Sequence, residues 1–239
     1  MSVLPDAAPA AHRALAWSGG AIFVAALAAY GWFFAAALAR PQVPGWPPAA
    51  AIPFNTLLFG AFAAHHSVLA RSGAKAWVTR VVPRRLERSL YVWTASLLLL
   101  AVFALWAHVP GTIYALPAPW AWLGTAAQLA GVWLTCRGAA VIAPLELAGI
   151  RQVYGDSRPA AFKVVGPFRW VRHPIYLGWL LIVFGAPLMT VDRLLWATIS
   201  SAYLVIAIPF EERGLSEAFG DAYRAYQARV RWRLLPGVW

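Results

Sequence analysis

Hydrophobic residues gather into six long stretches, and the segments between them hold nearly all of the charged residues. The first four stretches are long enough to cross about 30 Å of hydrocarbon as a helix, which takes roughly 20 residues. The last two, of about 17 residues, reach the lower limit for a span. The pattern predicts an all-α integral membrane protein with about six transmembrane helices, at Ala14–Ala39, Ile52–Ala70, Ser89–Ala107, Pro119–Ala143, Pro174–Met189 and Leu194–Phe210.

The basic residues alternate from one side of the predicted bilayer to the other. Of 20 Lys and Arg, 17 lie before the first stretch, between the second and third, between the fourth and fifth, or after the sixth. Basic loops are retained in the cytosol, so both termini are expected to be cytoplasmic, as in a protein of the bacterial inner membrane. Topology and contact with anionic membrane lipids then explain the formal charge of +11, and no nucleic-acid partner is expected.

The composition supports a lipid environment and limits the chemistry. Hydrophobic residues make up 61% of the 239 and charged residues only 12%, whereas about a quarter of a soluble chain is charged. Cys136 is the only cysteine, and the sequence has no HExxH or similar ligand spacing, so no metal is expected. Neither a dinucleotide-binding glycine motif nor a P-loop is present.

The last two stretches are predicted to form a helical hairpin, because only Thr190–Arg193 separates them. Its open end would bring Arg172–Tyr176 close to Glu211-Glu212. An amphipathic helix on the cytosolic side should follow, since apolar residues recur at helical spacing after Glu212. We expect residues 1–143 to form a bundle of four spans, and residues 144–239 to combine a cofactor-binding linker, the hairpin and the tail.

Two polar groups are candidates for chemistry. Glu211-Glu212 end an apolar stretch, where the helix dipole disfavours negative charge, so Arg172, His173 or a cationic ligand should compensate. His66 lies about one turn inside the second stretch and is a possible proton acceptor. Ordinary structural roles remain open for each group: the two carboxylates could mark the water boundary, and the histidine could bond to a neighbouring helix.

A spaced set of motifs between residues 150 and 236 resembles the C-terminal half of isoprenylcysteine carboxyl methyltransferases and their bacterial relatives. The set comprises Gly166-Pro167-Phe168, Arg172-His173-Pro174-Ile175-Tyr176-Leu177-Gly178, Glu211-Glu212, Phe219-Gly220, Tyr223, Tyr226 and Leu235-Pro236. Three further segments resemble the methanethiol S-methyltransferase branch, which is similar to the NnrU-type membrane proteins. They are His66–Arg71, Glu87–Val92 and Leu147–Gln152.

The resemblance implies S-adenosylmethionine as cofactor, bound at the cytosolic end of the hairpin. The residues that match cofactor-contacting positions are Gln152, Phe168, His173, Pro174, Ile175, Tyr176 and Glu211. Two departures stand out: Phe168 lies where the family often has tyrosine, and Ala207 replaces an arginine thought to hold a prenylcysteine carboxylate. The second departure favours a small or neutral acceptor.

The sequence therefore predicts a membrane methyltransferase that acts on a small thiol or another lipid-soluble substrate, with methanethiol as the best candidate. His66 or Arg172 would favour the thiolate, the first as a base and the second as a cation. Three alternatives remain: carboxyl- or N-methylation of a prenylcysteine or lipid, a non-enzymatic membrane protein of NnrU type, and a reductase similar to the sterol reductases that uses a nicotinamide cofactor.

Overall fold

The computed structural model describes residues 8–42, 45–142, 144–155 and 162–239, and most of them are helical, as predicted. The chain divides into two compact units that interleave in sequence. The first comprises residues 1–33, 57–106 and 142–160, and the second comprises residues 34–56, 107–141 and 161–239. Each unit is considered separately below.

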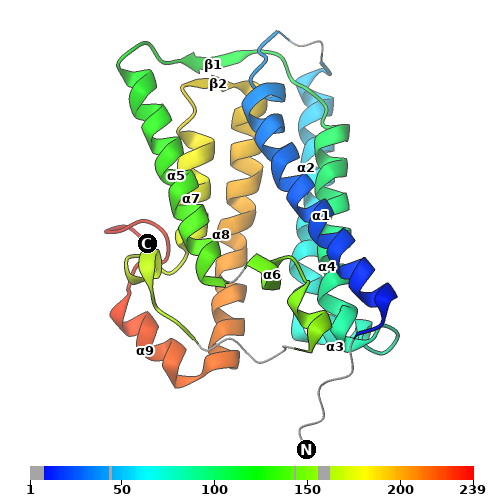
Figure 1. The fold of residues 1–239 in the computed structure, drawn as a ribbon. Coiled ribbons are helices and arrows are strands. Elements are labelled where there is room, and N and C mark those ends of the chain that lie inside the picture. Colours follow the sequence, from blue (N-terminus) through cyan, green and yellow to red (C-terminus); the bar gives the residue numbers. More distant parts are fainter. Residues whose placement is uncertain (1–7, 43–44, 143, 156–161) are drawn as a thin grey trace, which may run out of the picture. The chain divides into compact units, whose positions relative to one another are not determined.

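The first unit is built on two long helices that pack along one another, α1 (Ala10–Trp32) and α4 (Arg84–Leu105) (Figure 1). Gly19 of α1 allows the close approach, because a Cβ there would lie 2.6 Å from the indole ring of Trp93. The Trp93 indole N–H donates to the Leu15 carbonyl at 3.1 Å. The unit also contains most of α2 (Pro48–Leu69), α3 (Ser72–Val78), α6 (Pro144–Leu147) and the 3₁₀ turn η2 (Arg151–Tyr154).

The second unit contains the C-terminal hairpin, formed by α7 (Pro174–Phe184) and α8 (Val191–Phe219), with α5 (Trp120–Ile142) packed against α7. Glycines permit this packing: a Cβ on Gly131 would lie 2.5 Å from the Gly178 carbonyl oxygen. Small residues at such a contact let two helix backbones approach closely, as at membrane helix interfaces. The π-helical turn η1 (Phe33–Ala37), the 3₁₀ turn η3 (Gly166–Arg169) and α9 (Asp221–Arg229) complete the helical part.

The turn of the hairpin differs from the predicted short loop. Helix α7 ends at Phe184 rather than near Met189, because Gly185 follows it and Pro187 cannot continue a helix. The next residues form strand β2 (Leu188–Thr190), which pairs antiparallel with β1 (Thr112–Ala115). The sequence did not predict these two strands, because each is only three or four residues long.

Polar contacts fix this turn. The Thr190 hydroxyl accepts a hydrogen bond from the Arg193 backbone N–H and caps α8. The Arg193 guanidinium donates to the carbonyls of Leu188 at 2.6 Å and of Phe34 at 3.1 Å. The charge of this buried arginine is thus surrounded by carbonyl oxygens rather than by lipid.

Helix α8 is longer than predicted, because it continues past Glu211 and Glu212 to Phe219. The prediction that these two carboxylates end a helix is therefore wrong, and their charge does not oppose a helix C-terminus. Leu215 and Phe219 follow Glu212, where the sequence predicts the tail helix, but in the structure they belong to α8. They pack in one hydrophobic cluster with Tyr223 and Tyr226 of α9.

Three helical segments among the described residues are long and apolar enough to cross a membrane: Ala10–Ala37, Arg84–Leu105 and Val191–Phe219. Helix α7 is apolar but shorter, with 11 residues. A helix of that length rises about 16 Å, roughly half of a hydrocarbon core. The structure thus gives a mostly helical chain with spans of membrane length.

Candidate functional site

Two segments almost forty residues apart meet at the open end of the α7–α8 hairpin. The Tyr176 hydroxyl donates to Glu211 Oε2 at 2.7 Å, and Arg172 Nε donates to Glu212 Oε1 at 2.6 Å. Pro174 opens α7 at a position where a missing backbone N–H costs nothing. The predicted proximity of Arg172–Tyr176 to Glu211 and Glu212 is confirmed. We call this open end of the hairpin the hairpin entrance.

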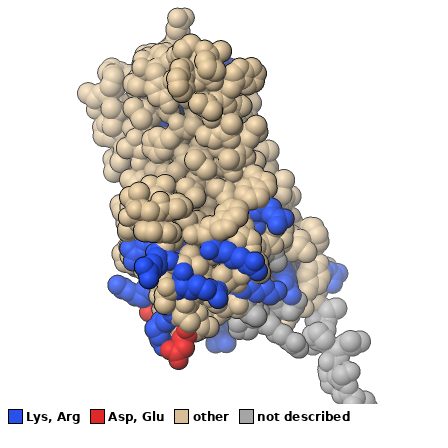
Figure 2. Space-filling view, turned by 90° about the vertical axis from the view of Figure 1, so that its left-hand side faces the viewer, with Lys and Arg blue, Asp and Glu red and all other residues tan. Residues whose placement is uncertain are grey.

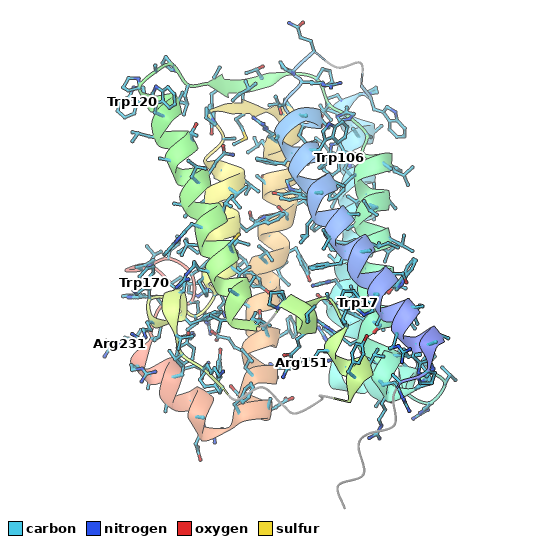
Figure 3. The ribbon with its side chains drawn as sticks, viewed as in Figure 1. Trp17, Trp106, Trp120, Arg151, Trp170 and Arg231 are labelled. Atoms are coloured by element: carbon cyan, nitrogen blue, oxygen red, sulfur yellow. The ribbon has the colours of Figure 1, made fainter. Side chains whose placement is uncertain are left out.

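The loop before α7 is held by the C-terminal segment of the chain. The backbone N–H of Arg172 donates to the Trp232 carbonyl at 2.9 Å, and that of His173 donates to the Arg233 carbonyl at the same distance. These two bonds fix the direction in which α7 starts. Figure 3 shows the segment at Arg231 beside the loop at Trp170.

Glu212 is a buried carboxylate that four side chains contact, and we refer to it with these partners as the Glu212 cluster. Its side chain is only 5% exposed. Besides Arg172, its oxygens lie 3.2 Å from His173 Nε2, 3.2 Å from Arg233 Nε and 3.4 Å from Gln227 Nε2. The cluster ties α8 to the loop before α7, to α9 and to the C-terminal segment, so its role in the fold is structural.

Arg172 is committed to the same cluster. Its guanidinium donates to both oxygens of Glu212 and, through Nη1, to the carbonyls of Val230 and Arg231, each at 2.9 Å. The side chain is 8% exposed. Four of its five N–H groups are therefore directed at atoms of the protein.

Glu211 has different surroundings from its neighbour. Its side chain is 45% exposed, and besides the Tyr176 hydroxyl it has His173 Nδ1 at 3.6 Å. The rings of His173 and Tyr176 stack with centroids 5.3 Å apart. A carboxylate that reaches solvent beside an aromatic face is suited to a cation, through charge and through the ring quadrupole.

His173 lies between the two carboxylates and is almost fully buried. Burial lowers the pKa of its imidazole, but the hydrogen bonds and charges of Glu211 and Glu212 raise it by more, so the pKa lies above its ordinary value. Its two ring nitrogens each have a carboxylate oxygen nearby, which favours the doubly protonated form.

The remaining predicted residues of this unit, Phe168, Pro174 and Ile175, lie in η3 and at the start of α7. Burial raises the pKa of the Tyr226 hydroxyl to about 12, and this protonated group donates to the Phe168 carbonyl at 2.8 Å. Pro174 is buried, and the Ile175 side chain fills the space beside Gly138 of α5. The structure therefore gathers Phe168, Arg172, His173, Pro174, Ile175, Tyr176 and Glu211 in one unit.

Gln152 and His66, by contrast, belong to the first unit. Gln152 lies in η2, where its amide donates to the Glu146 carbonyl at 3.4 Å and its Oε1 is buried without a hydrogen bond from any described residue. His66 Nδ1 lies 2.8 Å from the hydroxyl oxygen of Tyr91, and that hydroxyl also donates to the His66 carbonyl at 3.1 Å.

Comparison with known proteins places the chain in a family. It is 40% identical over 203 residues to the methanethiol S-methyltransferase of Mycobacterium tuberculosis, a match that covers 80% of each chain. The chain belongs to the methanethiol S-methyltransferase family. A second such enzyme, from Bradyrhizobium diazoefficiens, is 39% identical over 76% of this chain and 66% of its own.

Two further comparisons give a matching family model and a relative of lower identity. The profile named phospholipid methyltransferase matches residues 120–222, which include α5, the hairpin and the start of α9. The nurim protein of Rattus norvegicus is 30% identical over 76% of this chain and 74% of its own. No solved structure matches.

The charge pattern of this methyltransferase's sequence presented Glu211-Glu212 as a pair, and only the family resemblance singled out Glu211. In the structure Glu212 is buried in the Glu212 cluster, whereas the side chain of Glu211 is half-exposed. Arg233 and Gln227 were missed as partners of Glu212 for the same reason. The signal was present, because neighbouring residues of a helix point about 100° apart, but nothing in the sequence showed which one faces the protein.

Proposed function

We propose that this methyltransferase transfers the methyl group of S-adenosylmethionine to a small thiol, with methanethiol as substrate and dimethyl sulfide as product. The observation that carries the proposal is the half-exposed Glu211 carboxylate beside the stacked rings of Tyr176 and His173. Two relatives that are 40% and 39% identical are methanethiol S-methyltransferases, which supports the choice of acceptor.

The residues of the hairpin entrance fit a sulfonium cofactor. When bound, such a donor supplies an electrophilic methyl group on a positively charged sulfur. Glu211 would hold that charge through its exposed oxygen, while Tyr176 donates to the other oxygen and presents its ring. Phe168, Pro174 and Ile175 would contribute apolar surface, and His173 would orient both carboxylates. Gln152 is assigned to the cofactor by the family resemblance alone.

We infer that His66 accepts the proton of the thiol. The Tyr91 hydroxyl oxygen lies 2.8 Å from Nδ1 of His66 and 3.1 Å from its carbonyl oxygen, and these contacts hold the imidazole ring in place. A neutral imidazole can take the proton of the thiol and later release it to water, and the thiolate formed is the nucleophile.

Arg172 is assigned a positioning role rather than a catalytic one. Its guanidinium already satisfies Glu212 and two backbone carbonyls, so it holds the loop that begins α7. Stabilisation of a thiolate would require it to leave these acceptors, and a buried Glu212 would then be left with less compensating charge.

We propose that the chain crosses a bacterial inner membrane six times with both termini in the cytoplasm. Besides the three segments of membrane length, α2, α5 and α7 with the turn after it would provide the other spans. The distribution of basic residues supports this orientation. In Figure 2, Lys and Arg gather toward the end of the visible face at which α9 lies. The division into residues 1–143 and 144–239 stays a prediction.

The test is a headspace assay for dimethyl sulfide, with purified protein in detergent supplied with S-adenosylmethionine and methanethiol. Wild type and Glu217→Gln should form the product, because Glu217 is an exposed residue of α8 outside the site. Glu211→Gln should lose most of the activity while staying folded. Absence of product with the wild type would refute the thiol substrate.

Parallel assays separate the rival functions. The family model that matches residues 120–222 is that of phospholipid methyltransferases, and this match favours a lipid acceptor. Methyl-labelled cofactor with phospholipids or prenylcysteine in place of the thiol would therefore reveal N- or carboxyl-methylation. Binding of NADPH, without binding of S-adenosylmethionine, would indicate a reductase, and binding of neither would indicate a protein without enzymatic activity.

A further inference from the structure

An open cleft lies outside the hairpin entrance, between α5 and the loop at η3. Its volume is about 290 Å³, near the lower end of the range for small-molecule sites, roughly 300–1,000 Å³. Trp133 and Arg137 of α5 line one side, and Gly166, Pro167, Arg169 and Trp170 line the other. The Trp133 and Trp170 rings stack with centroids 6.1 Å apart.

The cleft lies on the side of α5 that faces away from the hairpin. Gly131 and Gly138 contact Gly178 and Ile175 of α7, and so define the inner face of the helix. Successive residues of a helix turn by about 100°, which places Trp133 and Arg137 on the opposite side. Both tryptophans are about half-exposed, Trp133 at 50% and Trp170 at 57%.

The cleft has positive charge without a protein counter-charge. Arg137 and Arg169 are exposed, and no described residue forms a hydrogen bond or ion pair with either guanidinium. The sequence contains no Asp or Glu in Trp120–Ile142 or in Gly166–His173. An arginine in a membrane helix is costly unless it meets an anion or reaches the polar interface.

We propose that this cleft binds the phosphate of an anionic phospholipid head group in the cytosolic leaflet. Arg137 is five residues from the end of α5, about 7 Å along the helix, which suits the depth of lipid phosphates if Ile142 lies at the cytosolic surface. The indole rings provide the amphipathic surface that tryptophan commonly presents at a membrane interface. The two guanidinium groups supply donors in a geometry that matches phosphate oxygens.

The far wall of the cleft is preformed. The Tyr226 hydroxyl holds the Phe168 carbonyl, and Gly166 adopts a φ of 56°, a conformation that other residues rarely take. The loop that carries Arg169 and Trp170 is therefore fixed by α9 before any lipid binds. A preorganised wall reduces the ordering cost of binding.

Native mass spectrometry of the full chain in detergent tests the proposal, with phosphatidylglycerol and phosphatidylcholine of the same acyl chains as probes. Wild type should retain phosphatidylglycerol in preference. The double variant Arg137→Gln, Arg169→Gln should lose that preference by about fivefold for each arginine, since basic groups near an anionic surface contribute about that factor. The variant Arg84→Gln, Arg85→Gln removes two exposed arginines at the start of α4 and should keep the preference.

Two measurements keep the result interpretable. Thermal unfolding must show that the double variant is folded, and Arg137→Lys, Arg169→Lys should retain most of the preference because the charge is kept. Equal retention of phosphatidylglycerol by wild type and the Gln variant would overturn the proposal. Displacement of the lipid by an equal concentration of inorganic phosphate would also overturn it, because the site would then bind a free anion. Neither readout requires methyl transfer.

Discussion

Glu211 and Glu212 are chemically identical neighbours with different surroundings, because the helix turns them toward different sides. Glu212 is buried among Arg172, His173 and Arg233, whereas Glu211 reaches solvent beside Tyr176. A buried carboxylate is stable only when its partners compensate the loss of hydration. A half-exposed one can exchange water for a ligand. We therefore propose that Glu212 stabilises the fold and that Glu211 binds the cofactor.

Glu212→Gln should destabilise the fold. The substitution removes the charge that balances Arg172 and leaves a buried guanidinium unpaired, which typically costs about 3–5 kcal/mol. Thermal unfolding in detergent measures the loss, and Glu211→Gln serves as the matched control because its exposed side chain should change the unfolding temperature little. Equal unfolding temperatures for wild type and Glu212→Gln would contradict the structural role.

The stability of the protein should fall as the pH rises above neutrality. The pKa of His173 is raised in the folded state, so its contribution is complete below the unfolded value of about 6.5 and is lost as the pH rises through the folded value. Unfolding temperatures measured between about pH 6 and pH 9 should decline for wild type. They should decline less for His173→Gln, and parallel declines for the two proteins would contradict the prediction.

For single residues, the sequence predicted which residues come together better than it predicted the role of each one. The sequence could predict that the motif beginning at Arg172 lies near the two glutamates, because a short hairpin brings the start of its first arm and the far part of its second arm to the same end. Tyr91 could not be predicted as the partner of His66, since the contact depends on how two helices of the first unit face one another. The catalytic assignment of His66 remains a prediction.

At the level of elements, the packing of α5 on α7 determines where the hairpin entrance lies. Glycines recur at seven-residue spacing, at positions 124, 131 and 138 of α5, and at 178 and 185 opposite them. Each lies where a side chain would collide with the other helix. The sequence indicated a hairpin with two arms of roughly 17 residues, but the end of α7 at Phe184 and the extension of α8 depended on local contacts that periodicity does not show.

Gly131→Ala should weaken this packing. The added Cβ would lie 2.5 Å from the backbone oxygen of Gly178, which cannot move without shifting α7. Overpacking of this kind typically costs about 1–3 kcal/mol. Gly60→Ala is the control, because a Cβ there meets nothing within 4 Å and the substitution should be neutral or slightly stabilising. A comparison of thermal unfolding decides, and an unchanged Gly131→Ala would show that the helices are not in close contact.

For the whole molecule, the alternation of basic residues predicts the orientation of the chain, and with it the side from which a cofactor would reach the hairpin. Charge counting gave this prediction without any structure, because the rule depends on loops rather than on packing. The residues that make up each of the two units could not be predicted in the same way, since their segments interleave along the chain.

Accessibility labelling tests the orientation. Cys136→Ser removes the only cysteine, and single cysteines can then be placed at Leu116, an exposed position after β1, or at Ala225, an exposed position in α9. A membrane-impermeant maleimide should label Leu116→Cys in intact cells, because that loop is predicted to be external. It should label Ala225→Cys only after lysis. The reverse pattern would place the hairpin entrance outside the cell.

The central claim is that Glu211 holds the positive charge of the methyl donor, and calorimetry with S-adenosylmethionine on purified protein tests it most directly. Wild type and Glu217→Gln should bind with equal affinity. Glu211→Gln should bind about 10–100-fold more weakly, since a hydrogen bond to a charged group contributes about 1.5–3 kcal/mol. S-adenosylhomocysteine, which has no sulfonium, should be affected less by the same substitution. Wild-type affinity for S-adenosylmethionine in a folded Glu211→Gln variant would contradict the account.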